Sequence, residues 1–390
     1  MNQLVNIAVV GLGQVGIYLL NELNAKKKDI ELKTGKKIKV VAVSAKNINK
    51  KRKFKFDKKI FYKNPLEIFN NTKVDILFEV IGLSDGISKK IVETALKNKI
   101  HVITPNKALI SKHGDFLAKL AEENNVNLEF EASVAGGIPI LRAIKEGLAT
   151  NKISKVYGIL NGTSNYILSE MRDSKDNFPN VLKKAQKLGY AEPGNPKLDL
   201  NGVDAFAKVR ILSALSFNTK ISKYKCLTEG IEKIELKDIE IANQLNSRIK
   251  LLGISEIINN QLFETVHPCI VSKNSYIGNV GGVMNAVIIE GKPIGESILQ
   301  GEGAGPGPTS SSLLSDLLSI LRGNIKKPFG IPSHKRKSIK CYNVNNYINS
   351  LYLRFEVKDK PGVLSKITNR LAKYKISVKR LIQTPDKKNN

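Results

Sequence analysis

The stretch that decides the fold lies at the N-terminus, where Val5-Asn-Ile-Ala-Val-Val10 runs into Gly11-Leu-Gly13-Gln-Val-Gly16 and then into Ile17-Tyr-Leu-Leu-Asn-Glu-Leu23. The first segment is almost entirely apolar, which is typical of a strand buried on both faces of a parallel sheet. The apolar residues of the last segment have helical spacing. A strand, a glycine-rich turn and a helix in this order predict the first unit of a doubly wound α/β sheet.

Each glycine of the turn has a physical role. The first permits a tight turn, the second lets the backbone approach a pyrophosphate, and the third lets the helix pack closely on the strand. The helix that follows offers free N–H groups and the positive end of its dipole to the phosphates. Because the turn joins a buried strand to a helix, we expect a nicotinamide dinucleotide to contact Gly11, Leu12, Gly13, Gln14, Val15 and Gly16.

The alternation of strands and helices continues along the first third of the chain. Further strands are predicted at residues 39–44, 76–81, 100–104 and 127–131, with helices at 88–97 and 116–124. Such alternation predicts a doubly wound parallel Rossmann sheet with helices on both faces. We place this NAD(P)-binding domain at residues 1–132.

The pattern changes after this domain. Strands are predicted at 154–160, 265–271 and 286–290, and long helices at 166–172, 180–188, 203–217 and 236–252. This mixture predicts a second, α+β domain at 133–325. Residues 326–349, which are basic and contain two prolines, are expected to be a linker. A partial βαβ unit at 350–390 then has strands at 352–357 and 377–383 around a helix at 363–374.

The composition excludes several classes of protein. The 390 residues carry 63 Lys and Arg against 35 Asp and Glu, but the lysines are spread among many Asn and Ile, so A/T-rich codons explain the net charge of +28. An anion-binding surface is the alternative; without a nucleic-acid motif we expect no nucleic-acid partner. No apolar run of about 18 residues and no signal-peptide pattern is present. With only three scattered cysteines, Cys226, Cys269 and Cys341, a cytoplasmic protein is expected.

The end of the second strand bears on the choice of coenzyme. An NAD enzyme usually places an acidic residue there to bind the ribose 2′-hydroxyl, whereas a 2′-phosphate requires cations. Here Ala45 and Lys46 follow the strand, and Lys50, Lys51 and Arg52 come soon after. The pattern favours NADP over NAD, with Lys46 as a coenzyme-binding residue; surface lysines from coding bias are the alternative.

Two later segments carry candidate catalytic groups. Lys107 ends the segment Thr-Pro-Asn-Lys beyond the fourth strand, at the sheet edge where ligands of α/β proteins bind. Further on, Glu192, Asp199, Asp204 and Lys208 lie on one short segment, and the last two project from one helix face. A simple helix salt bridge between Lys208 and Asp204 would leave the other carboxylates unexplained.

From about residue 5 to residue 325 the sequence resembles homoserine dehydrogenase. Besides the segments already described, the matching motifs are Glu131-Ala-Ser-Val-Ala-Gly-Gly-Ile-Pro139, Gly158-Ile-Leu-Asn-Gly-Thr-Ser-Asn165 and Gly301-Glu-Gly-Ala-Gly-Pro-Gly-Pro-Thr309. Members of that family interconvert L-homoserine and L-aspartate 4-semialdehyde with NAD(P), a step toward threonine, isoleucine and methionine. The resemblance therefore implies a hydride-transfer enzyme acting on a small-molecule substrate, and a homodimer. It also implies that residues 133–325 form the catalytic and dimerisation domain, whose helix at 310–323 packs back on the Rossmann part.

The resemblance also implies the roles of individual residues. Lys208 would donate the proton to the aldehyde oxygen with Lys107 beside it on the nicotinamide side, each cation lowering the pKa of the other. Glu192 and Asp204 would contact the substrate, with Asp199 in support. The chain departs from the family in this loop, because Glu192-Pro-Gly-Asn-Pro196 is one residue longer than the usual Glu-x-Asp-Pro.

Further assignments concern the coenzyme and a metal ion. The resemblance implies that Gly189 and Gly303 contact the coenzyme through their backbones; glycines required only by tight turns are the alternative. A carboxylate with several carbonyl oxygens suits a hard cation. A monovalent cation such as sodium would be bound by Glu131 and by the carbonyls of Val134, Gly136 and Ile138. Taken alone, Glu131 would be interpreted as a surface charge.

The C-terminal unit looks like the first half of an ACT regulatory domain, with Gly362 at the effector turn. Only three of the six elements of that domain are predicted, so threonine feedback does not follow. A sensor that binds coenzyme without chemistry is the competing hypothesis, but it has no use for Lys107 and Lys208. A phosphorylating semialdehyde dehydrogenase would need a nucleophilic cysteine, and no cysteine lies in a matching segment.

Overall fold

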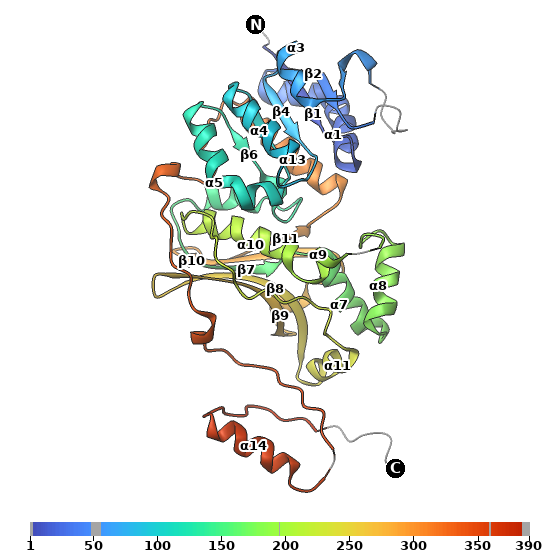
Figure 1. Cartoon of the computed structure of the whole chain (residues 1–390), viewed down its shortest axis with the longest axis vertical. Helices are drawn as coiled ribbons and strands as arrows, with labels where there is room; N and C mark the ends of the chain where they lie inside the picture. The colour runs from blue at the N-terminus through green and yellow to red at the C-terminus, as the bar shows by residue number, and fades with distance from the viewer. Residues whose placement is uncertain (1–2, 48–55, 195, 359, 384–390) are drawn as a thin grey trace.

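The computed structural model describes residues 3–47, 56–194, 196–358 and 360–383. Figure 1 shows a sheet at the N-terminal end, a second sheet in the middle and the helix α14 (Val363–Lys373) at the opposite end. In the described part of the chain, no helix has the length and apolar character needed to cross a membrane.

The first sheet is parallel and has the strand order β3-β2-β1-β4-β5-β6. Its strands are β1 (Leu4–Val10), β2 (Lys37–Ser44), β3 (Phe61–Tyr62), β4 (Ile76–Glu79), β5 (His101–Ile103) and β6 (Leu128–Glu129). The helices around it are α1 (Gln14–Ala25), α2 (Lys27–Thr34), α3 (Ile68–Asn71), α4 (Ile87–Lys97) and α5 (Lys107–Glu123). This arrangement confirms the predicted doubly wound Rossmann sheet.

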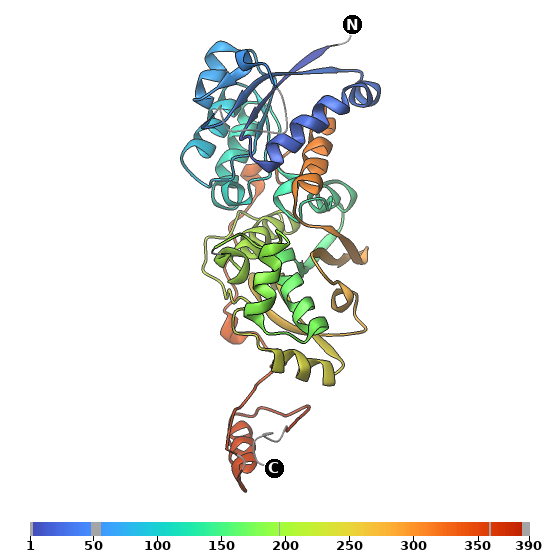
Figure 2. The same ribbon diagram turned by 90° about the vertical axis from the view of Figure 1, so that its right-hand side faces the viewer.

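Strand β1 is apolar apart from Asn6, which suits a strand whose two faces are both covered. Ile7 and Val9 pack with α1 and with α13 (Pro306–Leu321), while Ala8 and Val10 belong to the core that contains residues of α4 and α5. Helix α13 comes from the far end of the second domain's sequence and packs on α1. Figure 2 shows this pair, with α1 in blue and α13 in orange. The glycine turn and the loop before α13 are thereby held close together.

The second sheet is antiparallel and has the order β11-β10-β7-β8-β9. Its strands are β7 (Lys152–Ile159), β8 (Ser247–Ile258), β9 (Gln261–Ser272), β10 (Met284–Lys292) and β11 (Gly295–Glu302). One face is covered by α7 (Gly162–Ser174), α10 (Val203–Ser216) and α11 (Leu236–Gln244). Shorter or flanking helices are α6 (Ile140–Arg142), α8 (Phe178–Lys187), α9 (Lys197–Leu200) and α12 (Tyr276–Asn279). Because α10 also packs on α5, it connects the two sheets.

The predicted helix at 236–252 is wrong in its second half. Helix α11 ends at Gln244, and Asn246 then adopts a left-handed conformation with φ of +51°, which turns the chain into β8. Strand β8 forms a hairpin with β9 through Asn259 and Asn260, which both have positive φ, as a tight two-residue hairpin turn requires. The apolar side chains of Ile249, Leu251, Leu252 and Ile254 therefore lie on a strand and not on a helix.

The C-terminal unit also departs from the prediction. Residues 352–357 and 377–383 form no strand, and of the three predicted elements only the helix α14 is present. A strand needs a neighbouring strand to pair its backbone groups, and this segment pairs with none in the described part of the chain. Its apolar side chains Leu353, Phe355 and Val357 therefore remain exposed. By contrast, the predicted linker packs on the second domain, with bridges from Thr219 to Lys337 and from Leu262 to Cys341.

Candidate active site

The glycine turn has the geometry that a pyrophosphate site needs. Gly11 has a φ of +106° and donates a backbone hydrogen bond of 2.9 Å to the Ser44 carbonyl. A Cβ atom on Gly16 would lie 1.9 Å from the Gly11 carbonyl oxygen, so only glycine allows α1 to pack this closely. Gly13 precedes α1 without a side-chain cap and has open space beside it. The free N–H groups of α1 are thus available to an anion.

The end of β2 offers one described cation to the coenzyme. Lys46 is exposed two residues after the strand, and neither Ala45 nor Asn47 is acidic. The other three cations of the prediction, Lys50, Lys51 and Arg52, lie outside the described residues.

Two lysines and one carboxylate meet at the end of the first sheet. Lys107 begins α5 directly after β5, and its Nζ lies 2.6 Å from Oδ1 of Asp204. Lys208 Nζ lies 2.7 Å from the other oxygen of Asp204 and donates a second hydrogen bond of 2.6 Å to the Leu160 carbonyl. Two segments far apart in sequence are therefore joined by one buried carboxylate.

The surroundings treat the two lysines differently. Burial, assisted by the charge of Lys107, lowers the pKa of Lys208, although Asp204 opposes this. Burial is also the largest influence on the pKa of Lys107 and acts to lower it, but the charge and hydrogen bond of Asp204, together with the charges of Asp199 and Glu192, outweigh burial, so this pKa is raised. The expectation that each lysine lowers the pKa of the other is confirmed for the effect of Lys107 on Lys208; at Lys107 the surrounding carboxylates raise the pKa overall, and the effect of Lys208 on it stays a prediction. The two lysines hold the pKa of Asp204 below its usual range despite its burial.

Asn161 completes this cluster and was not among the predicted site residues. It caps α7 by accepting a hydrogen bond from the Ser164 N–H, and its amide nitrogen donates to Asp199 at 2.9 Å and to Asp204 at 3.1 Å. Burial raises the pKa of Asp199. An Asn directly before a Gly-Thr-Ser helix start is a recognisable capping signal, but its second role depends on tertiary packing.

The remaining predicted coenzyme and substrate residues lie around this cluster. Glu192 is exposed on the loop after α8, outside the hydrogen-bonded group, although its charge contributes to the raised pKa of Lys107. Gly189 has a φ of +77° at the start of the same loop. Gly303 precedes α13, and a Cβ on Gly136 would lie 2.5 Å from the Gly303 carbonyl oxygen. The loop that holds Gly136 is thus in contact with the loop that holds Gly303.

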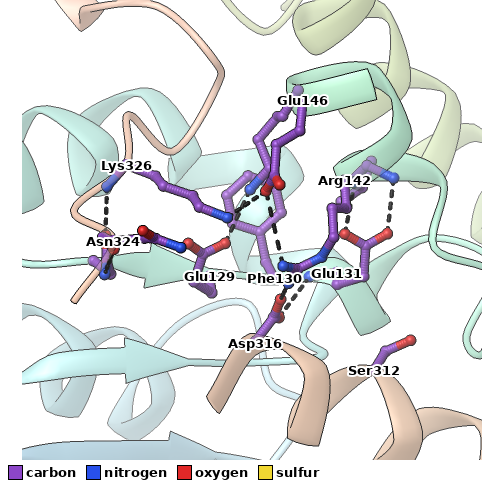
Figure 3. Close-up of polar contacts among 12 residues, drawn as sticks. Glu129, Phe130, Glu131, Arg142, Glu146, Ser312, Asp316, Asn324 and Lys326 are labelled. Atoms are coloured by element: carbon purple, nitrogen blue, oxygen red, sulfur yellow. Dashed lines mark hydrogen bonds and ion pairs between the residues drawn. The ribbon is translucent and has the colours of Figure 1, made fainter. Parts of the chain in front are cut away.

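Glu131 is buried and not a surface charge. Its two carboxylate oxygens accept hydrogen bonds of 2.8 and 2.7 Å from the backbone N–H groups of Leu141 and Arg142 at α6 (Figure 3). Asp316 of α13 accepts from the Glu131 N–H at 3.0 Å and from the Arg142 guanidinium at 2.9 Å. A hydroxyl of the same helix, that of Ser312, donates to the Gly136 carbonyl at 2.7 Å.

A second buried ion pair stands beside Glu131. Lys145 lies 2.9 Å from Glu129, and both side chains are almost fully buried. Burial, together with the charges of Glu129 and Glu131, raises the pKa of Asp316 well above its usual value. Burial raises the pKa of Glu131 as well. The cluster thus places three carboxyl groups against two cations, and burial disfavours the ionised form of two of them.

The comparisons with known proteins agree with this geometry. Residues 11–131 match the homoserine dehydrogenase NAD-binding domain, residues 139–318 match homoserine dehydrogenase, and residues 351–389 match the ACT domain. The homoserine dehydrogenase of Neisseria gonorrhoeae is 38% identical over 97% of this chain and 88% of its own length.

Solved structures give the same result. The crystal structure of a homoserine dehydrogenase from Thiobacillus denitrificans has a TM-score of 0.83 and 35% identity, covering 98% of this chain and 90% of that one. A hyperthermophilic archaeal homoserine dehydrogenase mutant in complex with NADPH has a TM-score of 0.67 and 25% identity, covering 81% and 97%. The chain belongs to the homoserine dehydrogenase family of NAD(P)-dependent oxidoreductases.

Proposed function

We propose that Lys208, Lys107 and Asp204 form the reaction centre at which this chain interconverts L-homoserine and L-aspartate 4-semialdehyde. The observation that carries the proposal is the buried Lys208 amine, which contacts Asp204 and whose pKa burial lowers from its usual value, the direction that a proton-transfer group needs. Lys107 follows a strand at the same sheet edge as the glycine turn, so a dinucleotide on that turn can reach both lysines.

The bound nicotinamide supplies or accepts the hydride at the substrate C4 carbon. In the reducing direction the Lys208 ammonium gives a proton to the aldehyde oxygen, which becomes the hydroxyl of homoserine. In the oxidising direction the neutral Lys208 amine takes that proton back. Asp204 orients both lysines, and Lys107 adds positive charge where negative charge develops on oxygen.

Substrate recognition is assigned to the carboxylates of the same segment. Homoserine carries an ammonium group, which needs anionic partners that a simple alcohol would not. Asn161 donates hydrogen bonds to both Asp199 and Asp204. Glu192 lies on the exposed loop after α8, and its charge acts on Lys107. We propose that all three contact the amino acid, with Glu192 closing on it from the exposed loop.

NADP is the proposed coenzyme, bound through the glycine turn, Lys46, Gly189 and Gly303. Its support is the exposed Lys46 and the lack of an acidic residue among Ala45, Lys46 and Asn47. Lys46→Ala should raise the KM for NADPH several-fold and leave the KM for NADH unchanged. Equal effects on both coenzymes would contradict the role of Lys46 at a 2′-phosphate.

A monovalent cation, sodium in the simplest case, is proposed for the loop of Glu131, Val134, Gly136 and Ile138. Glu129, Glu131 and Asp316 are at most 2% exposed, and within the described part of the chain Lys145 pairs with Glu129 and Arg142 with Asp316. A bound cation would favour the ionised form of Glu131 and Asp316 against the effect of burial, and the carbonyl oxygens of the loop are ligands that a hard cation accepts.

The chain is further proposed to be a cytoplasmic homodimer. Each copy has a coenzyme-binding domain at 1–132, a catalytic and dimerisation domain at 133–325, a connecting segment at 326–349 and a C-terminal ACT-like unit at 350–390. The three cysteines carry free thiols, which suits a reducing compartment. Ile270 and Tyr276 of the second domain expose apolar surface that a second copy could cover. Light scattering of the purified chain would measure the mass; a monomer at micromolar concentration would contradict the dimer.

Oxidation of NADPH by aspartate 4-semialdehyde tests the activity directly. Lys208→Ala should lower kcat by about 100-fold or more and leave coenzyme binding intact. Lys183→Ala, on the exposed face of α8, is the matched control and should change nothing. Unchanged turnover in Lys208→Ala would reject this mechanism, and no turnover in the native chain would favour a coenzyme sensor.

A further inference from the structure

Asn285 of β10 is a buried amide without a hydrogen-bond partner. Its side chain is 1% exposed, and neither its oxygen nor its nitrogen is hydrogen-bonded within the described part of the chain. An amide carries two N–H donors and one acceptor, and buried groups of this kind are nearly always paired in native proteins. The missing partner is therefore sought in a ligand.

Two glycines border this amide, and Gly303 makes room for it. A Cβ on Gly303 would lie 2.1 Å from both Cγ and Nδ2 of Asn285, so any other residue there would collide with the amide. A Cβ on Gly162 would lie 3.5 Å from Oδ1 of Asn285. In the sheet, Asn285 is paired with Gly301, and the next residue, Ala286, with Ile159. The amide thus sits between the loop before α13 and the start of α7.

Both neighbours belong to the site. Gly162 directly follows Asn161, which holds Asp199 and Asp204, and Leu160 accepts the hydrogen bond of Lys208. Gly303 is the proposed coenzyme contact, and its loop leads into α13, which packs on α1 beside the glycine turn. Asn285 therefore lies where the reaction centre meets the coenzyme-binding part.

We propose that the side-chain amide of Asn285 binds the carboxamide group of the nicotinamide ring. This inference rests on the proposed function. A carboxamide has one acceptor and two donors, so it satisfies both ends of the Asn285 amide at once. A substrate carboxylate would satisfy only the nitrogen, and a substrate ammonium only the oxygen. By fixing the carboxamide, Asn285 sets the rotation of the ring and thus which face of C4 meets the substrate.

Calorimetric binding to the full chain, without turnover, tests the inference with three ligands. They are NADP⁺, its 3-acetylpyridine analogue, in which a methyl group replaces the carboxamide NH₂, and adenosine 2′,5′-bisphosphate, which has no nicotinamide. NAD⁺ and ADP-ribose serve as the parallel pair. Asn285→Ala should raise the Kd of NADP⁺ about tenfold or more and leave the Kd of the bisphosphate unchanged. The substitution should raise the Kd of the acetylpyridine analogue by a smaller factor than it raises the Kd of NADP⁺.

Asn285→Asp keeps the shape and the acceptor and removes the donor, so it should weaken NADP⁺ as well. The native chain gives a check that needs no variant, because the acetylpyridine analogue should bind it more weakly than NADP⁺. Three results in the Asn285 variants would each overturn the assignment. They are an equal loss of affinity for NADP⁺ and for the bisphosphate, an unchanged Kd of NADP⁺, and a change confined to the affinity for homoserine. Failure of the semialdehyde assay alone would reject the proposed reaction and leave this binding result standing.

Discussion

Asp204 accepts a hydrogen bond of 2.7 Å from Lys208, one helical turn further along α10. On a helix surface such a pair contributes only a few tenths of a kcal/mol, but here both side chains are about 8% exposed. With less water around it, the carboxylate influences the protonation of the lysine strongly. The pair is thus a device for setting a pKa and not a means of stabilising the helix.

Asp204→Asn should shift the pH dependence of homoserine oxidation to lower pH. The carboxylate raises the pKa of Lys208 against the effect of burial, so its removal lowers that pKa further. Oxidation requires the neutral amine, and the rate rises as pH increases through the pKa of Lys208. The ascending limb of kcat/KM should therefore move to lower pH, together with a higher KM for homoserine. Asp173→Asn on the exposed end of α7 is the control, and a limb that stays in place or moves upward would refute the pairing.

Replacing Gly16 by alanine should reduce the stability of the fold, whereas replacing Gly13 by alanine should weaken coenzyme binding. A Cβ on Gly16 collides with the Gly11 carbonyl, so Gly16→Ala should lower the free energy of unfolding by about 1–3 kcal/mol. Gly13 has extended backbone angles and nothing near its Cβ, so Gly13→Ala should fold normally. Its methyl group would occupy the approach of the pyrophosphate and weaken coenzyme binding about tenfold or more. Thermal melts and calorimetry separate the two; equal losses of stability would contradict the assignment.

The first domain could be predicted from sequence because its signals are local. The apolar run 5–10 and the glycine turn each specify one conformation, and both faces of β1 are buried. The error at 236–252 has a different origin, since an apolar segment fits a helix or a strand equally well until its partner is known. At the C-terminus the predicted strands 352–357 and 377–383 had the right composition, but pairing is a property of the neighbouring chain segments.

For the proposed reaction centre, the sequence predicted which residues take part but not the contacts among them. Lys107, Asp204 and Lys208 were named from motifs, and the structure brings them together. No local pattern could indicate that one carboxylate bridges both lysines and raises the pKa of each, while deeper burial leaves the pKa of Lys208 lowered. Asn161 and Asn285 were missed for the same reason, because a polar residue at a helix start or in a strand acquires its role only through packing.

Asp316→Asn should weaken the dependence of stability on sodium. The buried cluster holds three carboxyl groups against Lys145 and Arg142, and the substitution removes one that a bound cation would keep ionised. The native chain should melt at higher temperature in sodium chloride than in tetramethylammonium chloride of equal ionic strength, because a bound cation stabilises the folded state. The variant should melt lower in both salts, since one donor loses its acceptor, and the difference between the salts should shrink. An undiminished difference would place the sodium effect elsewhere.

Arg336→Ala should show that residues 326–349 are part of the folded second domain. Its guanidinium lies 2.8 Å from Asp115, donates to the Thr219 carbonyl at 2.9 and 2.6 Å, and stacks 3.9 Å from the ring centre of Phe329. Truncation leaves a buried carbonyl and a carboxylate without their partner, so the free energy of unfolding should fall by about 3 kcal/mol or more. Lys335→Ala, on the exposed neighbouring residue, should change it by less than about 0.5 kcal/mol. Denaturant titration measures both, and equal effects would return this segment to the status of a linker.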